Sequence, residues 1–283
     1  MNDKKLDSGV ATPITIISAR NPPLKDVLNE FWQYRELLYM LTLRRISVRY
    51  KQTIVGITWV LLQPLVAMII FNVIFGKLIK IPTAGVPYPI FVYSALVLWT
   101  LFAEGVNRAS VSLIGESQLI SKVYFPRLMI PIAAVASAWI DFVVSLFLLL
   151  PLTFIYGLRP TWSLVLIPVL MGVTMLLATG IGLFFGALNV RYRDFQYLVP
   201  FLMQVLFFAS PVVFSVEIVP QQFQKWYYLN PMAAVIDGFR FAVTGITPVS
   251  GWALAWSMVC GVIFLGLGTL TFQAVEQEFA DVI

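Results

Sequence analysis

One stretch constrains this chain more than any other: a cluster of basic residues that runs directly into a long uncharged segment. From Gln52 to Gly76 there are 25 residues without an ionisable side chain, and a helix of about 20 apolar residues spans a hydrocarbon core of about 30 Å. Basic residues beside the first span hold that end on the cytoplasmic side. The segment therefore predicts a membrane-spanning helix with a cytoplasmic start. The basic residues are Arg35, Arg44, Arg45, Arg49 and Lys51.

The composition extends this prediction to the whole chain. Hydrophobic residues make up 59% of the 283 residues and charged residues 12%, whereas about a quarter of a soluble domain is charged. Lipid is therefore the solvent for most of the chain, and we expect one all-α integral membrane domain with six transmembrane helices. The spans are predicted at 52–76, 81–103, 128–158, 161–190, 195–216 and 251–275.

The charge distribution and the missing residue types exclude several classes of function. Nine of the nineteen basic residues precede the first span, which indicates a topology signal and contact with anionic lipids rather than nucleic-acid binding. The chain has no histidine, so histidine-based catalysis and His-ligated zinc are excluded. The single cysteine, Cys260, permits no intramolecular disulfide. We predict no catalytic residue, metal ligand or cofactor in this chain.

The residues before the first span divide into two parts. Residues 1–23 are polar and end in two prolines, which predicts a flexible cytoplasmic tail. In residues 24–51, apolar side chains recur at steps of three and four with charges between them, which predicts an amphipathic helix in the inner membrane interface. A helix packed on a soluble partner is the alternative. Residues 52–283 then form the membrane domain.

Two polar stretches interrupt the spans. Residues 104–127 are too polar to cross and are expected at the cytoplasmic surface, where 112–127 forms either a helix that docks on a partner or an interfacial helix. Residues 217–247 predict two short re-entrant helices broken at Asn230-Pro231, with a plain extracellular loop as the alternative. With both termini inside, fourteen basic residues are cytoplasmic and five lie outside, which agrees with the positive-inside rule.

Several residues within the spans have more than one interpretation. Asp141 is an acidic residue deep in a span; such a group lines a polar path or makes an interhelical hydrogen bond. Trp59, Tyr93 and Trp99 are candidates for the same path, and aromatic faces also stack on sugars, although interfacial aromatic belts explain most of them. Glycines in the fourth span predict close helix packing. They are Gly172, Gly180, Gly182 and Gly186.

The ordered set of motifs resembles the permeases of type-two ATP-binding-cassette exporters, in the branch that exports O-antigen, capsule and teichoic-acid polymers. The likeness runs from about Leu28 to the end. Its motifs are RRISVRYKQTIVGITWVLLQPL at the first span, LISKVYFPR after the second, LNVRYRDF after the fourth, YYLNPMAAVIDGFR before the sixth, and EQEFADVI at the end. No phosphate-binding P-loop motif is present in the chain, so an ATPase that drives it is a separate chain.

The resemblance implies a half-transporter of the bacterial cytoplasmic membrane that pairs with itself and with two copies of an ATPase, which carries the ATP and magnesium. The cargo would be a lipid-linked polysaccharide carried on polyprenyl pyrophosphate. Basic residues at the cytoplasmic gate would attract the pyrophosphate; they are Arg44, Arg45, Arg49, Lys51 and Arg108. A topology signal and contact with lipid also account for these residues. The resemblance further implies a coupling helix that contacts the ATPase. Its residues would be Gly115, Glu116, Ser121, Lys122, Val123, Tyr124 and Phe125.

Two other functions remain open from the sequence. A permease of the same fold could export a drug or a small lipid. A membrane scaffold of glycan assembly is a non-transport alternative, which the missing histidines do not exclude.

Overall fold

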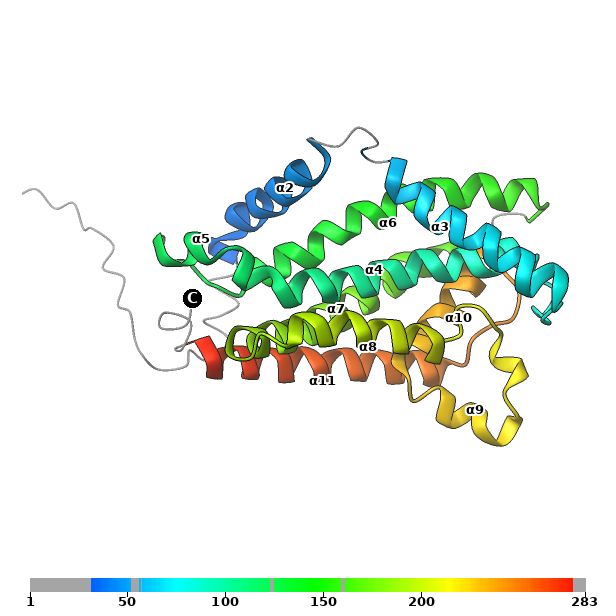
Figure 1. Ribbon diagram of the computed structural model, residues 1–283. Coiled ribbons are helices and arrows are strands. Elements are labelled where there is room, and N and C mark those ends of the chain that lie inside the picture. Colours follow the sequence, from blue (N-terminus) through cyan, green and yellow to red (C-terminus); the bar gives the residue numbers. More distant parts are fainter. Residues whose placement is uncertain (1–31, 52–55, 57, 123–124, 159–160, 277–283) are drawn as a thin grey trace, which may run out of the picture.

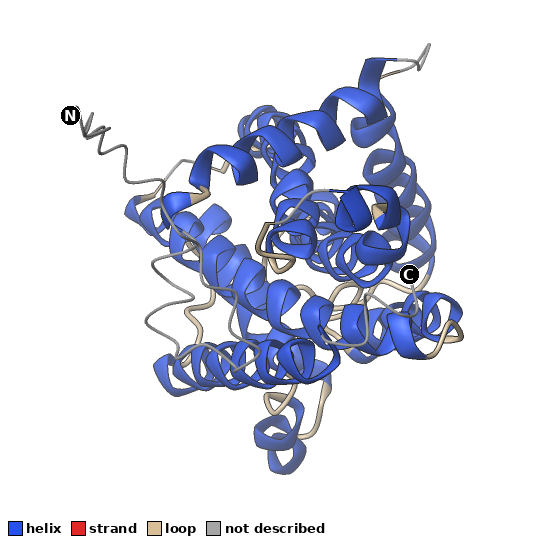
Figure 2. Cartoon of the chain, turned by 90° about the vertical axis from the view of Figure 1, so that its left-hand side faces the viewer, coloured by secondary structure: helices blue, strands red, loops and turns tan. Residues whose placement is uncertain are grey.

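The structure, a computed structural model, describes residues 32–51, 56, 58–122, 125–158 and 161–276. These residues form helices and loops (Figure 2), in agreement with the predicted all-α class. The helices are α2 (Arg35–Lys51), α3 (Thr58–Phe71), α4 (Tyr88–Gly115), α5 (Ser117–Lys122), α6 (Met129–Ile155), α7 (Leu166–Arg191), α8 (Phe195–Ala209), α9 (Gln221–Tyr227), α10 (Pro231–Thr244) and α11 (Gly251–Glu276). Shorter turns are η1 (Asn72–Leu78), η2 (Trp162–Val165) and η3 (Val216–Ile218).

The bundle is organised around α4. Its apolar side chains are buried on nearly every side against α6, α7, α8 and α10, and Tyr93, Leu98 and Val106 are fully buried. By contrast, α3 and α11 pack on the bundle with one side and leave most apolar side chains exposed or partly exposed. Because exposed apolar surface of this extent is not stable in water, it must face lipid or another protein surface.

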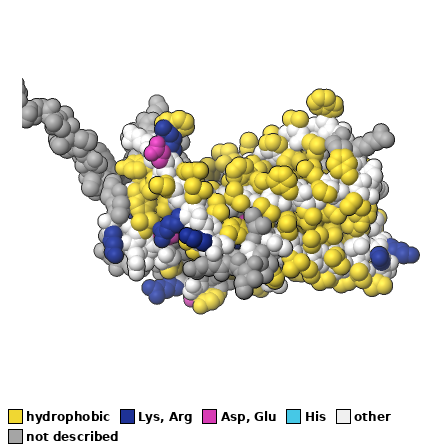
Figure 3. Space-filling model, turned by 90° about the horizontal axis from the view of Figure 1, so that it is seen from above, with side chains coloured by type: hydrophobic (Ala, Val, Ile, Leu, Met, Phe, Trp, Pro, Cys, Tyr) yellow, Lys and Arg dark blue, Asp and Glu magenta, His cyan; other side chains and the backbone are white. Residues whose placement is uncertain are grey.

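Five helical segments among the described residues are long and apolar enough to cross a membrane: Thr58–Leu78, Tyr88–Gly115, Met129–Ile155, Trp162–Arg191 and Gly251–Glu276. They run roughly parallel in Figure 1. Seen from above, hydrophobic side chains cover most of the bundle, and the visible charged ones gather toward its two ends (Figure 3). The chain is therefore a multi-pass membrane protein.

The predicted fifth span is shorter than expected. Instead of covering 195–216, α8 has 15 residues and ends at Ala209. Pro211 explains the end, because the residue before a proline is disfavoured in a helix and the proline has no N–H to continue it. At about 1.5 Å per residue, α8 falls short of the hydrocarbon thickness. The predicted count of six spans is thus not confirmed.

The predicted boundary after the second span is wrong. Residues 104–115, expected in a surface segment, continue α4 without interruption to Gly115. Their charges do not end the helix because they are paired: Arg108 Nε donates to Glu104 Oε2 over 3.0 Å one turn away. Of the predicted interface helix 24–51, the structure describes residues 32–51, whereas the predicted tail 1–23 lies outside the described residues.

Glycines bring α7 into close contact with its neighbours, as the sequence predicts. A Cβ on Gly180 would clash with the backbone of Phe264 and Leu265 in α11, and a Cβ on Gly182 would clash with Ala109 in α4. Gly172 differs, because a Cβ there would meet nothing within 4 Å. The packing role predicted for the four glycines therefore does not hold at Gly172.

The polar stretch 217–247 forms two helices, α9 and α10, at the end of the bundle opposite α2 and α5 (Figure 1). The break falls where the sequence predicts it. Asn230 caps α10 by accepting a hydrogen bond from the N–H of Met232 over 3.0 Å, and Pro231 occupies the first turn. Gly245 ends α10 in the left-handed conformation at φ 70°.

Candidate functional site: an arginine cavity between α2, α4 and α6

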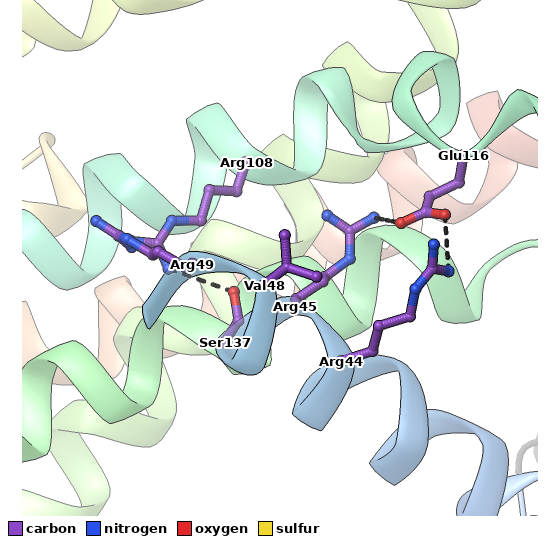
Figure 4. A pocket seen from close by; sticks show the side chains of 7 residues that line it. All are labelled: Arg44, Arg45, Val48, Arg49, Arg108, Glu116 and Ser137. Atoms are coloured by element: carbon purple, nitrogen blue, oxygen red, sulfur yellow. Dashed lines mark hydrogen bonds and ion pairs between the residues drawn. The ribbon is translucent and has the colours of Figure 1, made fainter. Parts of the chain in front are cut away.

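The site depends on how α2 lies against the bundle. Leu41 is buried in a small apolar cluster with Met129 and Ala133 of α6. Because residues three, four and eight positions after Leu41 lie on the same face of α2, they also face α4 and α6. Three of the five basic residues predicted near the gate, Arg44, Arg45 and Arg49, therefore face the bundle together (Figure 4).

The first group of contacts centres on Glu116, the turn residue between α4 and α5. Arg44 Nη1 lies 3.2 Å from Glu116 Oε2, and Arg45 Nη2 lies 3.5 Å from Oε1. Both guanidinium groups point toward this one carboxylate in Figure 4. The contact ties α2 to the start of α5.

The second group centres on Asp141 in the middle of α6. Arg49 Nη1 lies 2.7 Å from Asp141 Oδ2, and Arg108 of α4 bonds the same oxygen. The hydroxyl of Tyr50 donates to Oδ1. Asp141 thus joins three helices, and the predicted interhelical hydrogen bond is present; its place on a polar path stays a prediction.

Beside these contacts lies an open cavity of about 300 Å³, which we call the arginine cavity (Figure 4). Its lining residues come from α2, α4 and α6, with Glu116 from the turn before α5. They are Arg44, Arg45, Val48, Arg49, Arg108, Glu116 and Ser137. Ser137 accepts a hydrogen bond from Arg108 over 3.3 Å.

The cavity carries more positive than negative charge. Four guanidinium groups surround it, while Glu104, Glu116 and Asp141 supply three carboxylates. Burial lowers the pKa of Arg45 despite the nearby Glu116, so its carboxylate partner does not fully compensate its lost hydration. Burial also raises the pKa of Tyr50, with a contribution from its hydrogen bond to Asp141. The arrangement can bind an anion with paired N–H donors.

The sequence predicted four of these arginines but not their arrangement. Lys51 is exposed at the end of α2 and does not line the cavity. Glu116 was assigned to the coupling segment alone, and nothing in the sequence indicates Ser137. The one available signal is that Glu116 is one of two acidic residues in the predicted surface segment 104–127.

The predicted path residues lie in different surroundings. Tyr93 is fully buried and donates from its hydroxyl to the carbonyl of Ser145 over 3.3 Å. Trp99 is buried between Phe102 and Phe207, with ring centroids 5.5 and 5.8 Å away. Trp59 on α3 is 57% exposed. The structure brings none of these three to Asp141 through a described contact.

The predicted coupling segment contains α5 and its flanks. Gly115 and Lys122 are exposed, and Glu116 is held by α2. Phe125 is buried instead, in an apolar cluster that includes Phe272 and Val275 of α11. The side chain of Ser121 and all of Val123 and Tyr124 lie outside the described residues.

The loop after α5 is also fixed to α11. Arg127 Nη1 donates to the carbonyl of Glu276 over 2.7 Å at the end of that helix. The coupling segment is thus attached to α2 on one side and to the last span on the other.

A buried ion pair lies within α10 at the opposite end of the bundle. Arg240 Nη1 lies 2.9 Å from Asp237 Oδ1, one turn earlier on α10. The hydroxyl of Tyr228 donates to the other Asp237 oxygen over 3.1 Å. Both charges are therefore paired, and the pair has a structural role in α10.

Comparison with known proteins identifies the family. The family model described as "ABC-2 type transporter" matches residues 36–244, from the start of α2 to the last residue of α10. This range is well over half of the chain and contains both carboxylate centres of the arginine cavity. The chain belongs to the ABC-2 type transporter family.

Three relatives of this ABC-2 protein are similar over most of their length. The O-antigen export system permease protein RfbA of Myxococcus xanthus is 28% identical, over 91% of this chain and 99% of the relative. The protein of the same name from Klebsiella pneumoniae is 26% identical, over 88% and 95%. The polysialic acid transport protein KpsM of Escherichia coli is 24% identical, over 84% and 92%.

Proposed function

We propose that this chain is the permease subunit of an ATP-driven exporter that moves a lipid-linked polysaccharide outward across the bacterial cytoplasmic membrane. The observation that carries the proposal is the family match combined with relatives whose names specify O-antigen export and polysialic acid transport along nearly their whole length. The five apolar spans support a membrane subunit. ATP hydrolysis would be the work of a partner ATPase.

The proposed assembly has two copies of this chain and two ATPases. The exposed apolar faces of α3 and α8 offer surface that a second copy or lipid can cover. Both termini would be cytoplasmic, which requires α8 and the extended residues after it to make the fifth of six crossings. Figure 1 supports this path, because α8 starts near α5 and leads to α9 at the other end.

Within this assembly the arginine cavity would attract the cargo's pyrophosphate. Four guanidinium groups at one end of the bundle, three on the interface helix α2 and one on α4, suit a doubly charged phosphate group. Exposed positions around α5, such as Gly115 and Lys122, would contact the ATPase. At the far end, α9 and α10 would form the outer re-entrant pair that closes the channel. Trp59 is the exposed member of the proposed channel path.

Gentle purification from the native membrane, followed by mass analysis of the bound proteins and glycolipids, tests the function. We expect a P-loop ATPase at equal stoichiometry and a polyprenyl-linked glycan. An ATPase with a drug-sized molecule or simple lipid would instead support the small-lipid exporter. Glycosyltransferases without any ATPase would contradict transport and favour the scaffold.

A further inference from the structure

Glu116 connects the arginine cavity, where the cargo is proposed to bind, with α5, which is proposed to contact the ATPase. It is the turn residue at which α4 ends and α5 begins, and its side chain is largely buried. Its two carboxylate oxygens are bound by Arg44 and Arg45 of α2. The same two arginines line the arginine cavity. One pair of guanidinium groups therefore serves both the α5 turn and the cavity.

A phosphate group and a carboxylate compete for such donors. Guanidinium groups bind either anion through parallel N–H bonds, and a phosphate carries more charge and more acceptor oxygens. The Arg44 side chain is 58% exposed, and exposed ion pairs contribute little stability. The Arg45 contact is more buried, but at 3.5 Å it is longer than a charge-assisted hydrogen bond. A pyrophosphate in the cavity can therefore displace Glu116 from these arginines.

The displacement would leave α2 in place. Leu41 still packs on Met129 and Ala133, and Arg49 still pairs with Asp141, which is largely buried. The ion pairs between α2 and the turn before α5 would be lost, while Leu119 of α5 would remain beside the apolar cluster of Leu41.

We propose that Glu116 is an internal competitor for the cargo's phosphate groups, and that a pyrophosphate bound in the arginine cavity releases the turn before α5 from α2. This inference rests on the proposed function, because it assigns to the cavity a regulatory role: occupancy removes the ionic hold on the start of α5, whose apolar contacts through Leu119 and Ile120 remain. The empty permease holds α5 back, and the loaded permease does not.

Binding of inorganic pyrophosphate to the full chain in detergent, measured by calorimetry, gives the first test. Glu116→Gln removes the competing charge and keeps the side-chain shape. We expect its affinity to rise about fivefold, the ratio that corresponds to a weak ion pair. Glu36→Gln makes the same charge change at an exposed position of α2 and should leave the affinity unchanged. Equal affinities of Glu116→Gln and the unmodified chain would overturn the competition.

ATPase activity of the permease–ATPase complex in liposomes gives the second test. Undecaprenyl pyrophosphate should stimulate the unmodified complex, whereas undecaprenol should not. Glu116→Gln should be active without the lipid, at close to the stimulated rate. A basal rate equal to that of the unmodified complex would contradict the release of α5. Tighter pyrophosphate binding without stimulation by the lipid would contradict the proposed cargo while supporting the competition.

A distance measurement covers the case in which Glu116→Gln does not fold. Spin labels on Met40→Cys of α2 and Lys122→Cys of α5, both exposed positions, report the separation of the two helices after Cys260→Ala. Pyrophosphate should lengthen or broaden this distance. Adding Arg44→Gln and Arg45→Gln should remove the response to pyrophosphate. An unchanged distribution in the labelled chain would overturn the proposal.

Discussion

The guanidinium carbon of Arg240 lies 3.6 Å from the centroid of the Phe91 ring, and Arg240 Nε donates to the Phe91 carbonyl over 3.1 Å. This one side chain therefore joins α10 to the first turn of α4. It also bonds the carbonyls of Pro211 and Val212, which follow α8. A buried charge thus holds α10 to the bundle, in addition to the apolar packing of Val235, Ile236 and Phe239.

Removing that charge should be costly. Arg240→Met keeps much of the volume but leaves Asp237 without its cation and removes the guanidinium donor from three carbonyls. Loss of one partner from a buried pair typically costs about 3 to 5 kcal/mol, so we expect a large fall in Tm in detergent. Arg193→Met, at an exposed position between α7 and α8, is the matched control. Equal Tm values for both variants would contradict this role.

The glycines of α7 allow a second prediction with an internal control. Gly180→Ala places a methyl group against the backbone of α11, and such overpacking costs about 1 to 3 kcal/mol. Gly172→Ala meets open space on the same helix and should stabilise it by up to about 1 kcal/mol. Thermal unfolding of the two variants should therefore shift in opposite directions. A gain of stability in Gly180→Ala would show that α7 and α11 do not pack this closely.

The ion pairs of Asp141 can be measured by a double-mutant cycle. Asp141→Asn should lower stability by about 2 to 3 kcal/mol, less than for a fully buried pair because Arg49 is partly exposed. Its coupling with Arg49→Gln should be about 1 kcal/mol. The cycle with Arg44→Gln is the control and should be additive, since Arg44 pairs with Glu116. Additivity in both cycles would contradict the claim that Asp141 joins α2 to α6.

Substitutions at two residues of the predicted coupling segment should have different effects on stability and on coupling to ATP hydrolysis. Phe125→Ala leaves a cavity beside Phe272 and should destabilise the chain by about 3 to 5 kcal/mol. Lys122→Ala changes an exposed side chain, so its stability should stay within about 0.5 kcal/mol, while export per ATP hydrolysed should fall. The ratio of transport to hydrolysis in proteoliposomes, read beside Tm, separates the two. Normal coupling in a stable Lys122→Ala complex would remove this residue from the ATPase contact.

Helix positions were predictable where one physical signal dominates. The uncharged run 52–76 overlaps most of the helical segment Thr58–Leu78, and the predicted break at Asn230-Pro231 is present in the structure. The end of α4 was not predictable in the same way. Glu104 and Arg108 indicate a surface segment in the sequence, whereas in the structure they pair with each other, and Arg108 also pairs with Asp141. The length of the apolar run 195–216 also predicted a longer helix than α8, which ends at Ala209 before Pro211.

The site was only partly predictable for a related reason. Arg44, Arg45 and Arg49 follow from charge beside a span, but their use depends on contacts between residues far apart in the chain. Glu116 lies 72 positions from Arg44, and Ser137 carries no distinguishing signal. Phe125 shows the opposite case: an apolar residue in a polar segment is as well explained by burial against α11 as by a partner protein.

The central claim, export of a lipid-linked polysaccharide, is tested most directly in cells depleted of this chain. Surface polysaccharide and polyprenyl-linked polymer at the cytoplasmic face are measured together, with the intact chain restored as the control. The account predicts that surface polymer disappears while the lipid-linked polymer accumulates inside. Unchanged surface polymer, with no accumulation inside, would contradict it.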